Sequence, residues 1–291
     1  MVRKSSHFFV LCLALAPMAW AADVDLADKP MASGTSGEVK PNVMLVLDDS
    51  GSMTWTYMPD KAVNFHGSYG YVSSHCNAVY YDPTVTYAPP VDAAGNPYPN
   101  ASFTAARDDG FDTGSATQNL SKTFHPNLFT PQAANTTYNS SSYKSYLNYP
   151  LDKDGSTSTR KGDVPGFYYR YTGSQTKKDY IDQNSTFYKE CNSTIGQNPG
   201  KGVFQKVTVS NTSGPGGTDE RQNFANWYSY YRTRILTAKT AVGRAMATLS
   251  EPGNYRIGYR VLYASGTNSS LAIVDFCAAG DCTLRSNIYT K

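Results

Sequence analysis

Charged side chains are scarce in this sequence. Lys, Arg, Asp and Glu make up 17% of the 291 residues, and the formal net charge is +3. No run of lysines or arginines stands out, so the composition gives no indication of nucleic acid or an anionic membrane surface as a partner. Tyrosine, by contrast, occurs 23 times. Such an abundance of amphipathic rings is typical of recognition surfaces and, equally, of exported β-rich proteins.

Long hydrophobic runs are also missing, apart from one short stretch near the N-terminus. Two basic residues precede an apolar segment over residues 8–16, and Ala19–Ala21 (A-W-A) follows as a cleavage site. This order is that of a secretory signal peptide, and the run is too short to span a membrane. We therefore expect removal of residues 1–21, a small polar linker over residues 22–40, no membrane span, and an exported mature protein.

Cysteine and histidine are rare, with five and four copies. There is no C-x-x-C pair and the histidines are scattered, which argues against a zinc site. Cys12 lies in the signal peptide, so the exported chain keeps four cysteines, an even number that suggests two disulfides. Three pairings are possible; proximity in sequence favours Cys277 with Cys282 and leaves Cys76 with Cys191.

The most informative pattern lies at residues 41–53, PNVMLVLDDSGSM. The apolar run Val43–Leu47 predicts a strand buried on both faces, as in the centre of a parallel α/β sheet. Asp48, Ser50 and Ser52 follow at its carboxyl end, where open α/β sheets bind ligands. One carboxylate and two hydroxyls of low total charge suit a small divalent cation such as Mg²⁺, with coordination positions left for water or a partner's oxygen.

Two other interpretations of this motif are open. Asp-Ser-Gly is common in turns, because Asp and Ser bond to nearby backbone and Gly tolerates positive φ. In addition, Asp49–Ser52 and Asp112–Ser115 both fit D-[ST]-G-S, and paired Asp carboxylates are the machinery of aspartic proteases. The second copy, however, follows a charged turn instead of an apolar strand, and the copies are too close in sequence for two equivalent lobes. A hydrolase is therefore the least favoured alternative.

The segment after the motif lacks helical periodicity. Residues 54–218 are rich in Gly, Pro, Asn and Tyr, and turns separate short β-type pieces such as 85–87 and 204–209. We interpret residues 54–218 as an inserted β/loop-rich subdomain. Loop insertions cost little free energy and often carry binding specificity.

The helix expected after the first strand is displaced to the far side of this insertion. Apolar residues recur at helical spacing from Asp219, a predicted N-cap with Gln222 three residues later, to Leu249. The aromatic residues of this helix are expected to pack in a core. Strands at 256–264 and 271–276 follow, so that strand, helix and strand form one interrupted βαβ unit.

The D-x-S-x-S pattern after an apolar strand resembles the metal-ion-dependent adhesion site of von Willebrand factor A domains. The resemblance implies an α/β fold: an incomplete von Willebrand factor A-type, Rossmann-like sheet, with residues 41–53 and 219–291 as the N-terminal half of the domain. Adhesion sites of this type take further Thr and Asp ligands from later loops. Thr218 precedes the helix and Asp275 lies within a strand, so we expect neither to be a ligand and the chain to hold about half of a metal site.

Three segments together resemble the PilC/PilY family of type IV pilus tip-associated adhesins and pilus assembly factors: residues 43–53, 80–87 and 224–234. In that family an A-type region with a variable insertion precedes a β-propeller that carries a calcium loop. No propeller repeat occurs in this chain, so Ca²⁺ is implied by the resemblance alone. The resemblance also implies that the two hydroxyls contact Mg²⁺ or Mn²⁺ directly, while Asp48 acts through water.

From this resemblance we expect a non-enzymatic adhesin at the pilus tip, exported to the cell surface or outer membrane. Its partners would be the type IV pilus with its minor pilins, and a host or abiotic surface ligand that binds in a metal-dependent manner. The alternative is another secreted von Willebrand factor A-domain binding protein. An aspartic-type hydrolase is the third hypothesis.

Overall fold

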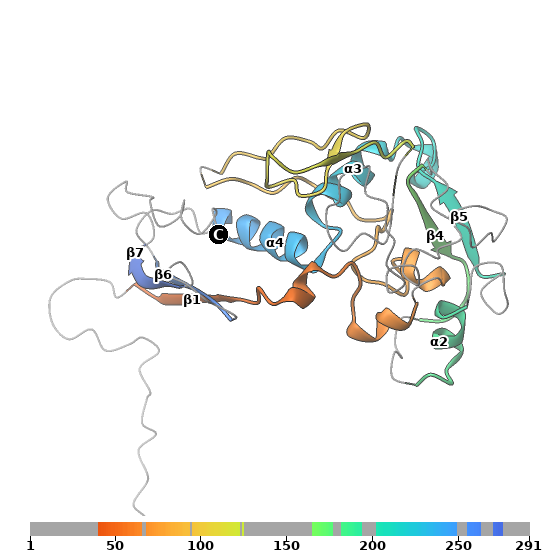
Figure 1. Cartoon of the computed structure of the whole chain (residues 1–291), viewed down its shortest axis with the longest axis horizontal. Helices are drawn as coiled ribbons and strands as arrows, with labels where there is room; N and C mark the ends of the chain where they lie inside the picture. The colour runs from red at the N-terminus through yellow and green to blue at the C-terminus, as the bar shows by residue number, and fades with distance from the viewer. Residues whose placement is uncertain are drawn as a thin grey trace, which may run out of the picture. The chain divides into compact units, whose positions relative to one another are not determined.

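The computed structural model describes residues 40–65, 68–93, 95–122, 124, 165–176, 182–193, 202–248 and 255–262, together with the backbone of 270–275. In chain order the elements, with η for 3₁₀ helices, are β1 (Asn42–Leu47), η1 (Gly51–Thr54), η2 (Asp60–Phe65), η3 (Tyr69–Val72), β2 (Ala106–Arg107), β3 (Thr117–Gln118), β4 (Phe167–Tyr171), α2 (Thr186–Cys191), β5 (Phe204–Thr208), η4 (Pro215–Gly217), α3 (Arg221–Tyr230), α4 (Arg234–Thr248), β6 (Arg256–Val261) and β7 (Ser270–Asp275) (Figure 1). The predictions for the signal peptide, the linker up to residue 39 and the Cys277–Cys282 pair lie outside the described residues. No helix within the described ranges is long and apolar enough to cross a membrane.

Three strands form one sheet, in the order β1-β6-β7, and β1 is the strand that directly precedes the Asp48–Ser52 motif. β1 and β6 are parallel, with register from Asn42 opposite Arg256 to Leu47 opposite Val261. β6 and β7 are antiparallel. Parallel neighbours need a crossover, and α4 lies between β1 and β6 in the chain and alongside the sheet (Figure 1). The predicted strand–helix–strand unit is therefore present.

One face of this sheet carries its apolar core. Ile257 and Tyr259 of β6 are buried with Met246 of α4, and alternate residues of β1 pack against them at intermediate burial. The opposite face of β1 is open: Met44 and Val46 are 48% and 49% exposed. The prediction that β1 is buried on both faces is thus wrong for the described part of the chain, because α4 covers one face and no other described element covers the second.

The predicted single helix is two helices, α3 and α4, separated by residues 231–233. The side chain of Thr233 caps the start of α4, where its hydroxyl accepts the Leu236 N–H at 3.2 Å. The hydroxyl of Thr240 donates to the carbonyl of Tyr230 at 2.8 Å and so satisfies an end group of α3. The capping box predicted at Asp219 is not formed. Asp219 instead pairs with Arg221, through both the backbone N–H and the guanidinium.

The insertion has an aromatic core of its own, and α3 belongs to it. Phe224, Trp227 and Tyr228 of α3 are buried with rings from the whole length of the insertion, among them Tyr71, Tyr81, Phe124, Phe167 and Tyr168. The helix α3 thus packs in the core of the insertion, whereas Val242 and Met246 of α4 pack in the core of the sheet. The aromatic residues of the predicted helix do pack in a core, as expected. The short helix α2 was not predicted, and residues 85–87 form no strand.

Many tyrosines pack in this core, and the hydroxyls of some of them donate to main-chain carbonyls. Tyr80 donates to Phe167 O at 2.7 Å, and Tyr230 donates to Pro99 O at 2.9 Å. Burial raises the pKa of both hydroxyls, to about 12 for Tyr230. The abundance of tyrosine thus reflects, in large part, the packing of a loop-rich domain, because the rings fill core volume while their hydroxyls bond to buried carbonyls or polar side chains.

Candidate metal-binding site

The carboxyl end of β1 leads into a tight turn that carries the three predicted ligands. Ser50 keeps an extended backbone, with φ −61° and ψ 157°, immediately before η1. Its N–H donates to Asp48 Oδ1 at 2.8 Å, and its carbonyl accepts the N–H of Met53 at 2.9 Å. The hydroxyls of Ser50 and Ser52 form a hydrogen bond, with their oxygens 2.9 Å apart. The structure therefore brings together the side chains that the sequence predicted to act together.

The electrostatics of this turn keep its carboxylate ionised. Hydrogen bonds from the Ser50 hydroxyl and, next in size, from the Ser50 N–H lower the pKa of Asp48, and the positive charge of Arg234 adds to the effect. Partial desolvation opposes them without reversing the direction. A carboxylate that is charged at neutral pH, with two hydroxyls beside it, is a set of hard oxygen donors.

The spacing of the hydroxyls fits a small divalent cation. Oxygen ligands of Mg²⁺ lie about 2.0–2.1 Å from the ion in octahedral geometry, which places adjacent ligands about 3.0 Å apart. The Ser50 and Ser52 oxygens meet that spacing with their 2.9 Å separation. Within the described residues no group of three or more His, Cys, Asp or Glu side chains gathers to hold a metal. The candidate donor set at this turn is the two hydroxyls and the Asp48 carboxylate.

Thr218 and Asp275, which the sequence predicts not to be ligands, have other contacts. The Thr218 hydroxyl donates to Pro215 O at 3.0 Å and closes a local loop before α3. Asp275 pairs in register with Arg256, at the start of β6. Because β1 and β6 are parallel and Asn42 also pairs with Arg256, Asp275 lies at the end of the sheet opposite Asp48. That neither residue is a metal ligand stays a prediction.

The second D-T-G-S copy is a turn. Asp112 Oδ1 accepts the N–H of Gly114 at 2.8 Å, and the Ser115 hydroxyl accepts the N–H of Asp109 at 2.9 Å. The segment lies between the two strands of the β2–β3 hairpin. Its Asp and Ser therefore act as turn residues, the role that their chemistry favours by default.

A cluster beside the site was missed by sequence reasoning. Trp55 and Tyr57 follow η1, and their rings stack with centroids 5.0 Å apart. The guanidinium of Arg234, the first residue of α4, lies 5.0 Å from the Trp55 ring and 5.3 Å from the Tyr57 ring. In the sequence, Arg234 stands out only as the last residue of the family-like segment 224–234. That position does not indicate that its side chain contacts Trp55 and Tyr57.

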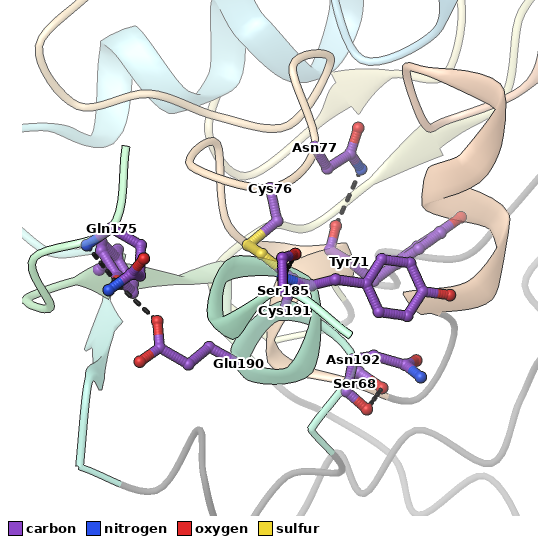
Figure 2. Close-up of a disulfide and its surroundings, with 11 residues drawn as sticks. Ser68, Tyr71, Cys76, Asn77, Gln175, Ser185, Glu190, Cys191 and Asn192 are labelled. Carbon is purple, nitrogen blue, oxygen red and sulfur yellow. Dashed lines mark hydrogen bonds between the residues drawn. A yellow bond between two sulfur atoms is a disulfide. The ribbon is translucent and has the colours of Figure 1, made fainter. Parts of the chain in front are cut away.

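A disulfide between Cys76 and Cys191 joins two distant parts of the insertion, with Cα atoms 5.9 Å apart (Figure 2). It is the long pairing that remained once Cys277 and Cys282 were assigned to each other. Ser68 and Tyr69 strengthen the same junction, since they donate to the carbonyls of Asn192 and Ser193. The disulfide therefore links the segment after η3 to the end of α2, and the hydrogen bonds of Ser68 and Tyr69 join the same two segments.

The segment 80–87 is also structural. Trp227 Nε1 donates to Val79 O at 2.9 Å, directly before it. Asn223 of α3 accepts the Tyr87 N–H at 2.7 Å and donates to both Tyr81 Oη and Val85 O. Two of the family-like segments are thus packing partners, because the loop 80–87 docks along α3.

Comparison with known proteins identifies relatives of one kind. No family model and no solved structure matches the chain. Type IV pilus biogenesis factor PilY1 of Pseudomonas aeruginosa strain PAK is 31% identical over 234 residues, which are 78% of this chain. The PilY1 proteins of strains PAO1 and UCBPP-PA14 are 32% and 33% identical over 238 and 231 residues.

The chain spans only 16% of the length of each of these relatives. The matched residues make up more than three quarters of this chain, and 31–33% of them are identical. The chain belongs to the PilC/PilY family.

Proposed function

We propose that this chain is the ligand-binding part of an exported, type IV pilus-associated surface protein, and that it binds its ligand through a divalent cation. The observation that carries the proposal is the 2.9 Å separation of the Ser50 and Ser52 hydroxyl oxygens beside an ionised Asp48. The two hydroxyls form a hydrogen bond at this distance, and the same distance separates adjacent ligands of a small divalent cation. The similarity to PilY1 supports the association with the pilus.

The proposed mechanism is recognition without chemistry. Ser50 and Ser52 would contact Mg²⁺ or Mn²⁺ directly, and Asp48 would hold it through water. When bound, the cation supplies an open coordination position to an Asp or Glu carboxylate of the partner. The residues of this chain keep the donor oxygens oriented, and the low charge of the set leaves the cation able to attract that carboxylate.

We further propose that β1, α4 and β6 belong to a von Willebrand factor A-type sheet and that the inserted subdomain shapes the rest of the binding surface. On this view the protein acts at the pilus tip, in contact with minor pilins and with a host or abiotic ligand. We propose no enzymatic role. The second D-T-G-S copy is a turn in a hairpin, which removes the main argument for an aspartic hydrolase.

The experiment is a cell-surface assay that scores display and attachment separately. Ser50→Ala/Ser52→Ala should be displayed at wild-type levels and should lose attachment, and EDTA should have the same effect on the wild type. Thr54→Ala, a hydroxyl in the same turn that donates only to Gly51 O, is the matched control and should attach normally. Normal, EDTA-insensitive attachment by the double Ser variant would show that the metal is not involved.

A further inference from the structure

The contacts of Arg234 connect α4 to the segment that directly follows the Ser52 turn. Its backbone N–H donates to Trp55 O at 3.1 Å, and its Nε donates to Tyr57 O at 2.8 Å. Its guanidinium also lies over both rings, and one terminal nitrogen lies 2.7 Å from Asp60. We call Arg234, Trp55, Tyr57 and Asp60 the Arg234 clamp. One side chain thus holds three residues within a six-residue stretch.

The first residue of the clamp, Trp55, lies three residues after Ser52, the nearest proposed ligand. Trp55 directly follows η1, and its N–H donates to the carbonyl of Ser52 at 3.2 Å. Any displacement of Trp55 would therefore change the position of the Ser52 hydroxyl relative to Ser50. We propose that Arg234 is a positioning residue for the metal site, which acts by holding Ser52 at the spacing a cation requires; the metal-related part of this inference rests on the proposed function.

The positive charge of Arg234 does not explain why an arginine lies beside the candidate metal site. A cation beside a cation site opposes metal binding, and Arg234 does lower the pKa of Asp48. The ion pair with Asp60 is a weak reason as well, because the Asp60 side chain is 79% exposed and such pairs contribute little. What remains is the geometry: a planar group that stacks on two rings while it donates to a carbonyl. Lysine has the charge of arginine but lacks this shape.

Hydrogen exchange in the absence of metal tests the positioning role by itself. Arg234→Lys should speed exchange of the Met53 and Trp55 amides about tenfold, with amides of α3 and β6 unchanged. Arg244→Lys, on the same helix, and Asp60→Asn, which removes only the exposed ion pair, should leave exchange as in the wild type. Trp55→Leu keeps Arg234 and removes one ring of the clamp, so it should speed Met53 exchange as well. Unchanged Met53 and Trp55 amides, or an equal increase throughout the chain, would overturn the inference.

Metal binding then separates positioning from charge. With Mn²⁺ as the probe, Arg234→Lys should weaken binding about tenfold while the pKa of Asp48, followed by carboxyl ¹³C shifts, stays at its wild-type value. Wild-type affinity in Arg234→Lys would contradict the positioning role. If the wild type itself binds no Mn²⁺, the proposed function fails, and the exchange experiment still decides whether Arg234 holds the turn.

Discussion

The N–H of Tyr87 donates to Oδ1 of Asn223 at 2.7 Å, across 136 positions of the sequence. The side-chain amide of Asn223 also donates, through Nδ2, to Tyr81 Oη at 3.0 Å and to Val85 O at 2.8 Å. One side chain therefore satisfies the loop 80–87 at three points and fixes it to α3. The loop 80–87 is thus fixed to the helix that contains most of the family-like segment 224–234.

Asn223→Ala should destabilise the insertion. It leaves the Tyr87 N–H and the Val85 carbonyl without their partner, which costs about 1–3 kcal/mol when such groups are shielded from water. Urea unfolding followed by tryptophan fluorescence measures the change, since Trp227 is buried next to this contact. Asn184→Ala, an exposed asparagine in a turn, should change the free energy of unfolding by less than about 0.5 kcal/mol. Equal effects of the two variants would contradict the structural role of Asn223.

The sequence predicted the topology of the sheet better than its burial. An apolar run, a helical period and a second apolar run are enough to indicate β1, α4 and β6, and the parallel register follows. The break at 231–233 was not predicted, because the helical period continues through it while the hydroxyls of Thr233 and Thr240 bond to the two helix ends. The assignment of α3 to the insertion could not be predicted either, because it depends on rings more than 100 residues away, such as Tyr81. The helical period of apolar residues shows that one face of a helix is apolar, but it does not show in which hydrophobic core that face packs.

Two neighbouring positions on β1 test the one-sided burial of the sheet. Leu45→Asp should prevent folding of the sheet region, because Leu45 packs against the core with Ile257 and Tyr259 and a buried unpaired carboxylate is costly. Met44→Asp introduces the same charge on the opposite face and should change stability little, since Met44 is 48% exposed. Circular dichroism with thermal unfolding separates the outcomes. If Met44→Asp is as damaging as Leu45→Asp, both faces of β1 are covered.

Loss of the Cys76–Cys191 disulfide should destabilise the insertion strongly. The bond closes a loop with a sequence separation of 115, for which chain entropy gives about 4–5 kcal/mol. Cys76→Ala/Cys191→Ala avoids an unpaired thiol, and its free energy of unfolding should fall by about that amount under oxidising conditions. Addition of a reductant to the double variant is the control and should produce no further loss at this pair. A decrease below about 1 kcal/mol would show that the link adds little to the contacts around it.

Alkaline pH should unfold the insertion through its tyrosines. Burial raises the pKa of Tyr169 and Tyr230 to about 12, above the value of about 10 in an unfolded chain. Between these values the unfolded state binds fewer protons, so the stability present below pH 10 falls as the pH rises toward 12. Tyr169→Phe removes one such hydroxyl and should make the alkaline decrease smaller. A stability that is flat from pH 9 to 12 would contradict the burial of these hydroxyls.

The geometry of the candidate site was predicted in part. The spacing of Asp48, Ser50 and Ser52 after a strand is local information, and the turn does place the two hydroxyls together. Their role as metal ligands stays a prediction. Arg234 was not identified, because its role depends on Trp55 and Tyr57, whose sequence distance from α4 is the length of the insertion. Local spacing in the sequence thus indicates the candidate donor residues. The residues that position them, such as Arg234, are identified only from tertiary contacts.

The most direct test of the metal site is the broadening of amide NMR signals by substoichiometric Mn²⁺. Because only one carboxylate and two hydroxyls are present, binding to this chain should be weak, in the millimolar range, and calorimetry with Mg²⁺ should show little heat. Paramagnetic broadening still locates a weak site. The account predicts selective loss of the signals of residues 48–54, recovered in Ser50→Ala/Ser52→Ala and unaffected by Thr54→Ala. Broadening that persists in the double Ser variant, or that centres on Asp109 and Asp112 instead, would contradict it.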